Sequence, residues 1–237
     1  MTNPDRQLLG QRRFTALTFD CYGTLVDWER GACAALRRLL PPDVADLADD
    51  TLVQRFLTAD RQLTERGLMP YAEVLAQTVR EIAEHEGIAV DPRAARAFAA
   101  SVPSWPLFEE TNPVLEQLSR RYRLAIISNI DERLIAETLK GITVSFDVVM
   151  TSERAQTYKP DRDIFTQALS ELDEPPEQVL HVAEGLCEAT PARALGMGSV
   201  WVRRSDRSDD GSGAEPHAQV GCLAELVPIL CPDAPMP

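Results

Sequence analysis

Five short apolar runs, each four or five residues long and bounded by polar residues, stand out along the chain. Runs this short and this uniformly apolar are typical of strands buried on both faces of a parallel sheet. They cover residues 17–20, 124–128, 147–151, 179–183 and 199–202.

Between the later runs, apolar residues recur at the three-to-four-residue spacing of amphipathic helices. The predicted helices cover residues 113–121, 132–140, 163–172 and 189–195, with a last helix over 223–230. Strands that alternate with helices form βαβ units, so the pattern predicts an α/β fold with a doubly wound parallel sheet.

Residues 30–102 break this alternation, because they carry much helical signal and almost no strand signal. Four helices are predicted there, over 31–40, 51–66, 71–86 and 92–100, separated by Pro- and Gly-containing breaks. A helical block inserted after the first strand is expected to cover the end of that strand like a lid. We therefore predict a core domain of residues 1–28 and 108–237 and a helical cap domain of residues 29–107.

Composition narrows the class of partner. The 237 residues carry a formal net charge of −13, which disfavours nucleic acid and anionic membrane surfaces. No stretch is long and apolar enough to span a bilayer, and residues 1–13 lack the apolar centre of a signal peptide. The five cysteines have no paired spacing, which favours reduced thiols and a cytoplasmic location.

The polar segment 203–219 is expected to form a mobile surface loop.

Polar side chains follow the apolar runs at the points where the strands end. Because carboxyl ends of parallel strands meet at one crevice, these residues are expected to lie close together. They are Asp20 with Thr24, the pair Ser128 and Asn129, Lys159 before a helix, and Glu184 with Glu188. His181, inside an apolar run, is interpreted as a packed core histidine.

This set, in this order and with a helical insertion after the first strand, resembles the haloacid dehalogenase superfamily from about residue 14 to residue 230. The run from Asp20 through Tyr22 to Leu25, the pair 128–129 and the segment 158–161 are similar to the L-2-haloacid dehalogenase branch. The resemblance implies a Rossmann-like core with an inserted cap, and a hydrolase that acts on a small carboxylate substrate.

The residues support a covalent mechanism. The carboxylate of Asp20 can attack an electrophilic carbon or phosphorus, and a nearby Lys159 would keep it ionised. Thr24 and Ser128 can donate hydrogen bonds to Asp20 or to a substrate carboxylate, and Asn129 can donate to a leaving halide. Trp28 is expected to form a wall of the pocket.

Tyr22 points to the kind of leaving group. Superfamily phosphatases carry an acid two residues after the nucleophile to protonate the leaving oxygen, and tyrosine, with an ordinary pKa of about 10, replaces it poorly. A halide leaves as a stable anion and needs no proton. Tyr22 therefore favours displacement of halide from C2 of a 2-haloacid, followed by hydrolysis of the aspartyl ester.

The fourth motif departs from the family pattern. By position Glu188 falls on the Asp that helps to activate water in the dehalogenases, so it is the candidate general base. No cofactor is required by this scheme, although Asp20, Glu184 and Glu188 leave a Mg²⁺ site open. The family's halide-binding Arg lies in the helical insert, where Arg61 is the preferred candidate.

Three alternatives stay open. Asp20 could displace another leaving group, such as the amine of an azetidine carboxylate; the chain could be a Mg²⁺-dependent phosphatase; or it could be a catalytically degenerate binding protein. A homodimer also stays open, since dimers are common in the resembling family.

Overall fold

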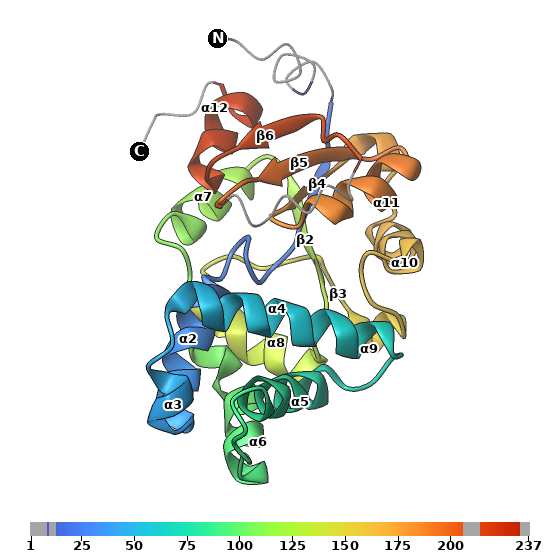
Figure 1. The fold of residues 1–237 in the computed structure, drawn as a ribbon. Helices are drawn as coiled ribbons and strands as arrows, with labels where there is room; N and C mark the ends of the chain where they lie inside the picture. Colours follow the sequence, from blue (N-terminus) through green and yellow to red (C-terminus); the bar gives the residue numbers. More distant parts are fainter. Residues whose placement is uncertain (1–8, 10–12, 206–213, 233–237) are drawn as a thin grey trace.

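The computed structural model describes residue 9 and residues 13–205 and 214–232. Six parallel strands form one sheet in the order β3-β2-β1-β4-β5-β6. They are β1 (Ala16–Phe19), β2 (Arg123–Ser128), β3 (Val148–Thr151), β4 (Val179–Ala183), β5 (Gly198–Val202) and β6 (Ala218–Val220). The predicted doubly wound parallel sheet is confirmed (Figure 1).

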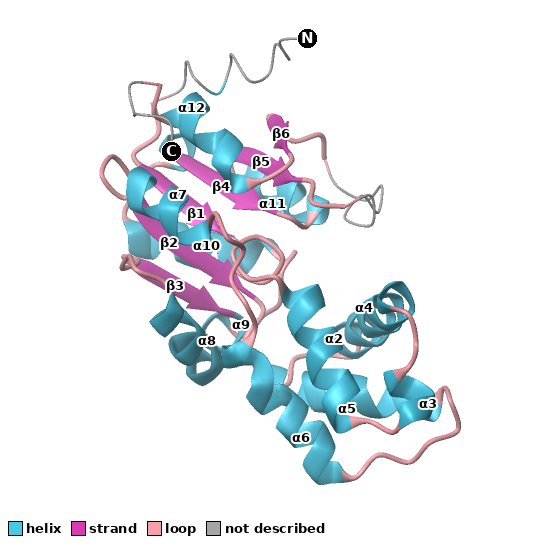
Figure 2. Cartoon of the chain, turned by 90° about the vertical axis from the view of Figure 1, so that its left-hand side faces the viewer, coloured by secondary structure: helices cyan, strands magenta, loops and turns pink. Residues whose placement is uncertain are grey.

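Helices cover both faces of the sheet (Figure 2). They are α7 (Thr111–Leu118), α8 (Glu132–Thr138), α9 (Ser152–Ala155), α10 (Arg162–Leu172), α11 (Ala189–Ala194) and α12 (Leu226–Leu230). Single 3-10 turns join them: η2 (Leu139–Gly141), η3 (Pro176–Gln178), η4 (Leu186–Glu188) and η6 (Leu223–Glu225).

The two faces of the sheet have separate hydrophobic cores, because successive strand residues point to opposite sides. Leu17 and Phe19 belong to the cluster that includes buried residues of α7, α8 and α12. Ala16 belongs to the other cluster, with buried residues of α10 and α11. Strands buried on both faces explain why the sequence shows short apolar runs rather than alternation.

Between β1 and α7 the chain forms a helical unit, which lies below the sheet in Figure 1. Its elements are α2 (Trp28–Leu39), α3 (Pro42–Ala45), α4 (Asp49–Glu65), α5 (Tyr71–Glu84), α6 (Pro92–Ser101) and η1 (Val102–Ser104). The four helices predicted here are present, and α3 adds a single turn. The division of the chain at residues 29 and 107 stays a prediction.

The two segments that join this helical unit to the sheet run side by side. Asp27 N donates to Pro106 O at 2.8 Å, and Phe108 N donates to Leu25 O at 3.1 Å. Val26 and Leu107 form an antiparallel bridge between these bonds. The chain therefore enters and leaves the helical unit at the same place, next to the end of β1.

Strand β6 corrects the end of the surface loop expected over residues 203–219, because residues 218 and 219 belong to the sheet. Ala218 and Val220 are buried at the edge of the sheet while Gln219 is exposed, so three residues extend the sheet in a stretch too short for its periodicity to be recognised. Residues 206–213 of that segment lie outside the described residues, as do 1–8 and 10–12 of the polar N-terminal segment.

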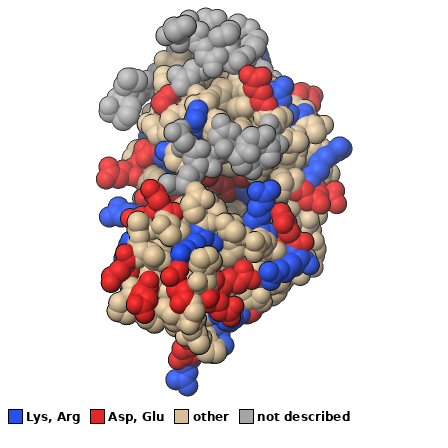
Figure 3. Space-filling model, in the orientation of Figure 1, with Lys and Arg blue, Asp and Glu red and all other residues tan. Residues whose placement is uncertain are grey.

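On the face seen in Figure 3, acidic and basic side chains are interspersed. Among the described residues, no helix combines the length and the apolar character needed to cross a membrane.

Candidate active site

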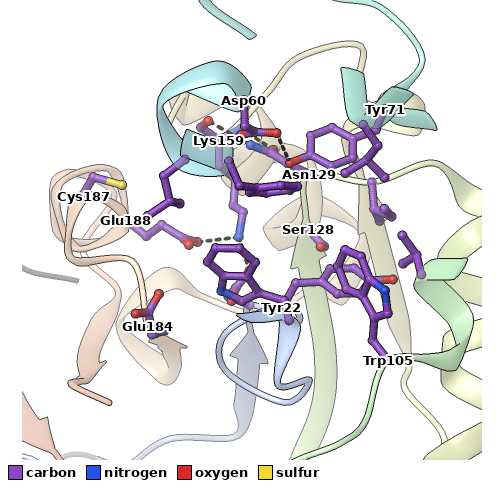
Figure 4. Close-up of a pocket in the computed structure, with 17 residues that line it drawn as sticks. Tyr22, Asp60, Tyr71, Trp105, Ser128, Asn129, Lys159, Glu184, Cys187 and Glu188 are labelled. Atoms are coloured by element: carbon purple, nitrogen blue, oxygen red, sulfur yellow. Dashed lines mark hydrogen bonds and ion pairs between the residues drawn. The ribbon is translucent and has the colours of Figure 1, made fainter. Parts of the chain in front are cut away.

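A cavity of about 290 Å³ lies where the carboxyl ends of the strands face the helical unit (Figure 4). β1 is paired with β2 on one side and with β4 on the other, so Asp20 follows the strand at which the chain order reverses, where open α/β sheets bind ligands. Eight of the residues expected in the site line this cavity: Asp20, Tyr22, Trp28, Ser128, Asn129, Lys159, Glu184 and Glu188.

A tight turn directly after β1 presents Asp20 to the cavity. Leu25 N and Val26 N both donate to Cys21 O, at 2.8 and 2.9 Å. Gly23 has a φ of +109°, a conformation that strains other residues, and a Cβ there would lie 3.1 Å from Glu184 Oε2. The backbone conformation therefore favours glycine here, and any side chain would also crowd Glu184.

Arg204, which the sequence analysis did not single out, braces this turn from the end of β5. Its Nε donates to Gly23 O at 3.0 Å and its Nη2 donates to Thr24 O at 2.7 Å. Its Nη1 pairs with Glu110 at 2.9 Å, and its guanidinium lies 3.4 Å from the ring centroid of Phe108. These contacts fix the turn that positions Asp20.

Both carboxylate oxygens of Asp20 have a donor. Lys159 Nζ lies 2.6 Å from Oδ1, and Thr24 Oγ1 donates to Oδ2 at 2.9 Å. Thr24 Oγ1 in turn accepts the Glu184 amide at 2.9 Å, although Thr24 does not itself line the cavity. The carboxylate is thus held in one orientation, as a nucleophile requires.

Lys159 is held at its backbone as well as at its ammonium. Asn129 Oδ1 accepts from Lys159 N at 2.7 Å, and Asn129 Nδ2 donates to Lys159 O at 3.1 Å. The ammonium also contacts Glu188 Oε2 at 2.8 Å, so it bridges two carboxylates. The geometry gives Asn129 a positioning function that was not expected from the sequence.

His181 is buried, as expected, but it is also part of the polar network. Its Nε2 lies 3.0 Å from Glu188 Oε2, and its Nδ1 lies 2.9 Å from Thr18 Oγ1. With a proton on Nε2, the ring donates to the carboxylate, and its Nδ1 is within hydrogen-bond distance of the hydroxyl. The alternation of β4 places this side chain beneath the site.

The electrostatic environment differs between the two carboxylates. Burial raises the pKa of Asp20, and the ammonium of Lys159 offsets part of that effect. Burial also opposes ionisation of Glu188, but Lys159 and the hydrogen bond from His181 outweigh it and lower the pKa of Glu188. The ammonium of Lys159 therefore favours the ionised form of both carboxylates against the effect of burial.

Arg61, the candidate halide ligand, is not in the cavity. Its side chain is 71% exposed and pairs with Glu65 at 3.1 Å on the outer face of α4. The neighbouring Asp60 lies inside the cavity instead. The spacing of the apolar residues Phe56, Ala59 and Leu63 places the buried stripe of α4 beside position 60 and away from 61, a signal that the sequence analysis did not use.

Aromatic side chains from several elements form much of the wall. Trp28, predicted for this role, packs on Phe56 with ring centroids 5.1 Å apart. Trp105, which was not predicted, meets Tyr22 edge to face at 6.1 Å. The hydroxyl of Tyr22 is engaged with Thr138 Oγ1 at 2.9 Å.

The acidic residues that leave a Mg²⁺ site open all line the cavity, and whether they bind Mg²⁺ stays a prediction. Among the described residues, no three His, Cys, Asp or Glu side chains form a group that could bind a metal ion, and this includes Asp20, Glu184 and Glu188. The Lys159 ammonium lies between two of these carboxylates and repels a second cation there.

Comparisons with known proteins agree with this architecture. Residues 14–196 match the family model described as haloacid dehalogenase-like hydrolase. The (S)-2-haloacid dehalogenase of Pseudomonas sp. (strain YL) is 25% identical over 219 residues, covering 90% of this chain and 93% of that protein. The human haloacid dehalogenase-like hydrolase domain-containing protein 3 is 36% identical over 169 residues, covering 68% of this chain and 66% of that protein.

A solved structure shows the same fold. The L-2-haloacid dehalogenase from Xanthobacter autotrophicus superimposes with a TM-score of 0.79 at 19% identity, covering 90% of this chain and 96% of that one. With the family model matching most of the chain and the sheet, turn and helical unit arranged as described, this chain belongs to the haloacid dehalogenase-like hydrolases.

Proposed function

We propose that the chain hydrolyses a short 2-haloalkanoic acid to the corresponding 2-hydroxy acid through an aspartyl-ester intermediate on Asp20. The observation that carries the proposal is the orientation of Asp20 at the cavity, with one oxygen on the ammonium of Lys159 and the other on Thr24. The named (S)-2-haloacid dehalogenase among the relatives supports it.

The first step is displacement at carbon. An Asp20 oxygen attacks C2 of the substrate, the carbon–halogen bond breaks, and the halide leaves with the bonding electrons and with inversion at C2. Ser128, which is buried beside the cavity, offers a hydroxyl to the substrate carboxylate. One amide hydrogen of Asn129 bonds to Lys159, and the other can donate to the departing halide.

The second step is hydrolysis of the ester. Water attacks the Asp20 carbonyl carbon while Glu188 accepts one of its protons; the ester bond between that carbon and the substrate oxygen then breaks, the second water proton passes to that oxygen, and the 2-hydroxy acid leaves as the Asp20 carboxylate is restored. The bonds from Lys159 and His181 orient Glu188 for this role. Glu188 then releases the proton to solvent.

Tyr22 favours this reaction over phosphate-ester hydrolysis. Burial raises the pKa of Tyr22 above its ordinary value. Its hydroxyl is bonded to Thr138, and it is a poor proton donor for a leaving alkoxide. A halide needs no proton, so the residue at this position does not impede the displacement.

The test is a single turnover in H₂¹⁸O with 2-chloropropanoate and with haloacetates, in the presence of EDTA. We expect halide release, and we expect the peptide that contains Asp20 to gain ¹⁸O, because water attacks the enzyme ester and not the substrate. Asp20→Asn is the control and should release no halide. Label in the product of the first turnover, or no halide from any short 2-haloacid, would contradict the proposal.

A further inference from the structure

A carboxylate and a tyrosine form a pair at one end of the cavity, apart from the groups assigned above. Tyr71 OH donates to Asp60 Oδ1 at 2.7 Å. Figure 4 shows this pair at the opposite end of the cavity from Glu184. Asp60 comes from α4 and Tyr71 from the start of α5, so the helical unit supplies both.

No basic side chain among the described residues pairs with the Asp60 carboxylate at this end of the cavity. In the part of the chain that the structure describes, the cavity lining includes four carboxylates and one basic side chain, Lys159. That ammonium is already shared between Asp20 and Glu188. Within the same described residues, Tyr71 is the one hydrogen-bond donor to the Asp60 carboxylate, and no lysine or arginine pairs with it.

The walls near this carboxylate suit a cation. Phe56, one helical turn before Asp60, lines the cavity together with Trp28 and Tyr71, and the Tyr71 ring makes a T-shaped contact with Tyr158 at a centroid distance of 6.1 Å. Aromatic faces attract an ammonium group, most strongly where water is excluded. A simple haloacid anion would instead meet a negative charge among apolar rings.

We propose that Asp60 binds an ammonium group of the substrate, so that the acid turned over in this cavity carries a positively charged amino group in addition to its leaving group at C2. The inference rests on the proposed function and names its substrate class. Asp60 becomes the specificity-determining residue, Tyr71 orients it, and the substrate carboxylate lies toward Ser128.

The titration of Asp60 agrees with this geometry. Burial raises the pKa of Asp60 to about 6, although the hydrogen bond from Tyr71 lowers it. The carboxylate is therefore mostly ionised at neutral pH while bearing a desolvation cost. A bound ammonium would relieve that cost.

Binding of inert pairs of equal chain length tests the proposal without turnover. The pairs are 3-aminopropanoate with propanoate, 4-aminobutanoate with butanoate and 5-aminopentanoate with pentanoate, titrated calorimetrically at neutral pH. For at least one length we expect the amino acid to bind about tenfold more tightly or better, as one charged hydrogen bond provides. We expect Asp60→Asn to abolish that preference.

The control variant is Glu65→Gln, which removes the same charge from the outer face of the same helix and should keep the preference. Equal or tighter binding of the plain alkanoates by the wild type, or a preference that survives in Asp60→Asn, would overturn the proposal. Because no bond is broken in these titrations, they remain informative if the halide-release experiment fails. Circular dichroism of both variants verifies that they are folded.

Discussion

At the scale of single residues, Lys159 determines the charge state of the site. Its ammonium is bonded to Asp20 and Glu188, and all three side chains are buried. Two buried carboxylates this close to one another would repel without a cation between them. The candidate nucleophile and the candidate base therefore both pair with one lysine, which Asn129 holds through its backbone.

Lys159→Met should reduce turnover about 100-fold or more, because Asp20 loses its charged partner. It should also lower the free energy of unfolding by about 3–5 kcal/mol, the cost of leaving a buried charge unpaired. Urea unfolding and steady-state kinetics measure the two effects. The control is Lys140→Met, whose ammonium is exposed and pairs with Glu137, and it should change neither.

The pH dependence of that stability loss has a defined sign. In the wild type the pKa of Glu188 is lowered, so its contribution to stability is present above its unfolded pKa and is lost as the pH falls. Without Lys159, burial raises the Glu188 pKa and protonation becomes favourable. The difference between wild type and Lys159→Met should therefore be larger at neutral than at acidic pH, and a difference independent of pH would contradict the assigned charge state.

At the scale of elements, the sheet and the helical unit are linked by a helix cap that crosses between them. Asp131 follows β2 and immediately precedes α8, where it would ordinarily cap that helix. Its side chain instead accepts from Tyr71 N at 2.6 Å and Ala72 N at 2.7 Å, at the start of α5. The α8 amide of Glu132 donates to Glu153 at 2.7 Å in compensation.

Asp131→Ala should lower stability by about 1–2 kcal/mol, as the loss of a cap does. It should also raise KM, because the start of α5, including Tyr71, is no longer fastened to the sheet. The matched control is Asp91→Ala, which removes a cap internal to the helical unit. Both should lose stability in thermal unfolding, but the change in KM is expected for Asp131→Ala alone, and equal KM changes would refute the positioning role.

At the scale of the whole molecule, the cavity is lined by both the sheet and the helical unit. Asp20, Ser128 and Lys159 lie at the carboxyl ends of the strands. Phe56 and Asp60 come from the helical unit, and Trp105 comes from the segment that leads back to the sheet. The candidate catalytic residues therefore lie on the sheet side of the cavity, and much of its wall comes from the helical unit. This division explains how one core can serve different substrates within a family.

Activity should be independent of Mg²⁺. Lys159 occupies the position between Asp20 and Glu188, and a divalent cation there would face its ammonium. Halide release should be unchanged by EDTA and by added Mg²⁺. Hydrolysis of p-nitrophenyl phosphate that appears with Mg²⁺ and disappears on chelation would show that the phosphatase alternative is correct.

The sequence predicted the parts of this protein that depend on local patterns. Short apolar runs identified five of the six strands, and the helical block after β1 was recognised from its lack of strand signal. The residues at the strand ends were correctly expected to lie close together, because in a parallel sheet those ends meet at one edge. β6 was missed because a three-residue edge strand has too little periodicity to stand out.

What only the tertiary structure decided is which side chains of the helical unit face the cavity. The helical period already separates Arg61 from Asp60, since neighbouring helix positions point about 100° apart, but only the packing of α4 shows that the side of the helix with Asp60 borders the cavity. The hydrogen bonds of Asp131, Asn129 and His181 likewise could not be predicted, because their partners lie elsewhere in the sequence. The sequence determined the candidate nucleophile and its sheet, because these follow from local order; the packing of α4 and α5 decided which side chains of the helical unit, Asp60 among them, line the cavity.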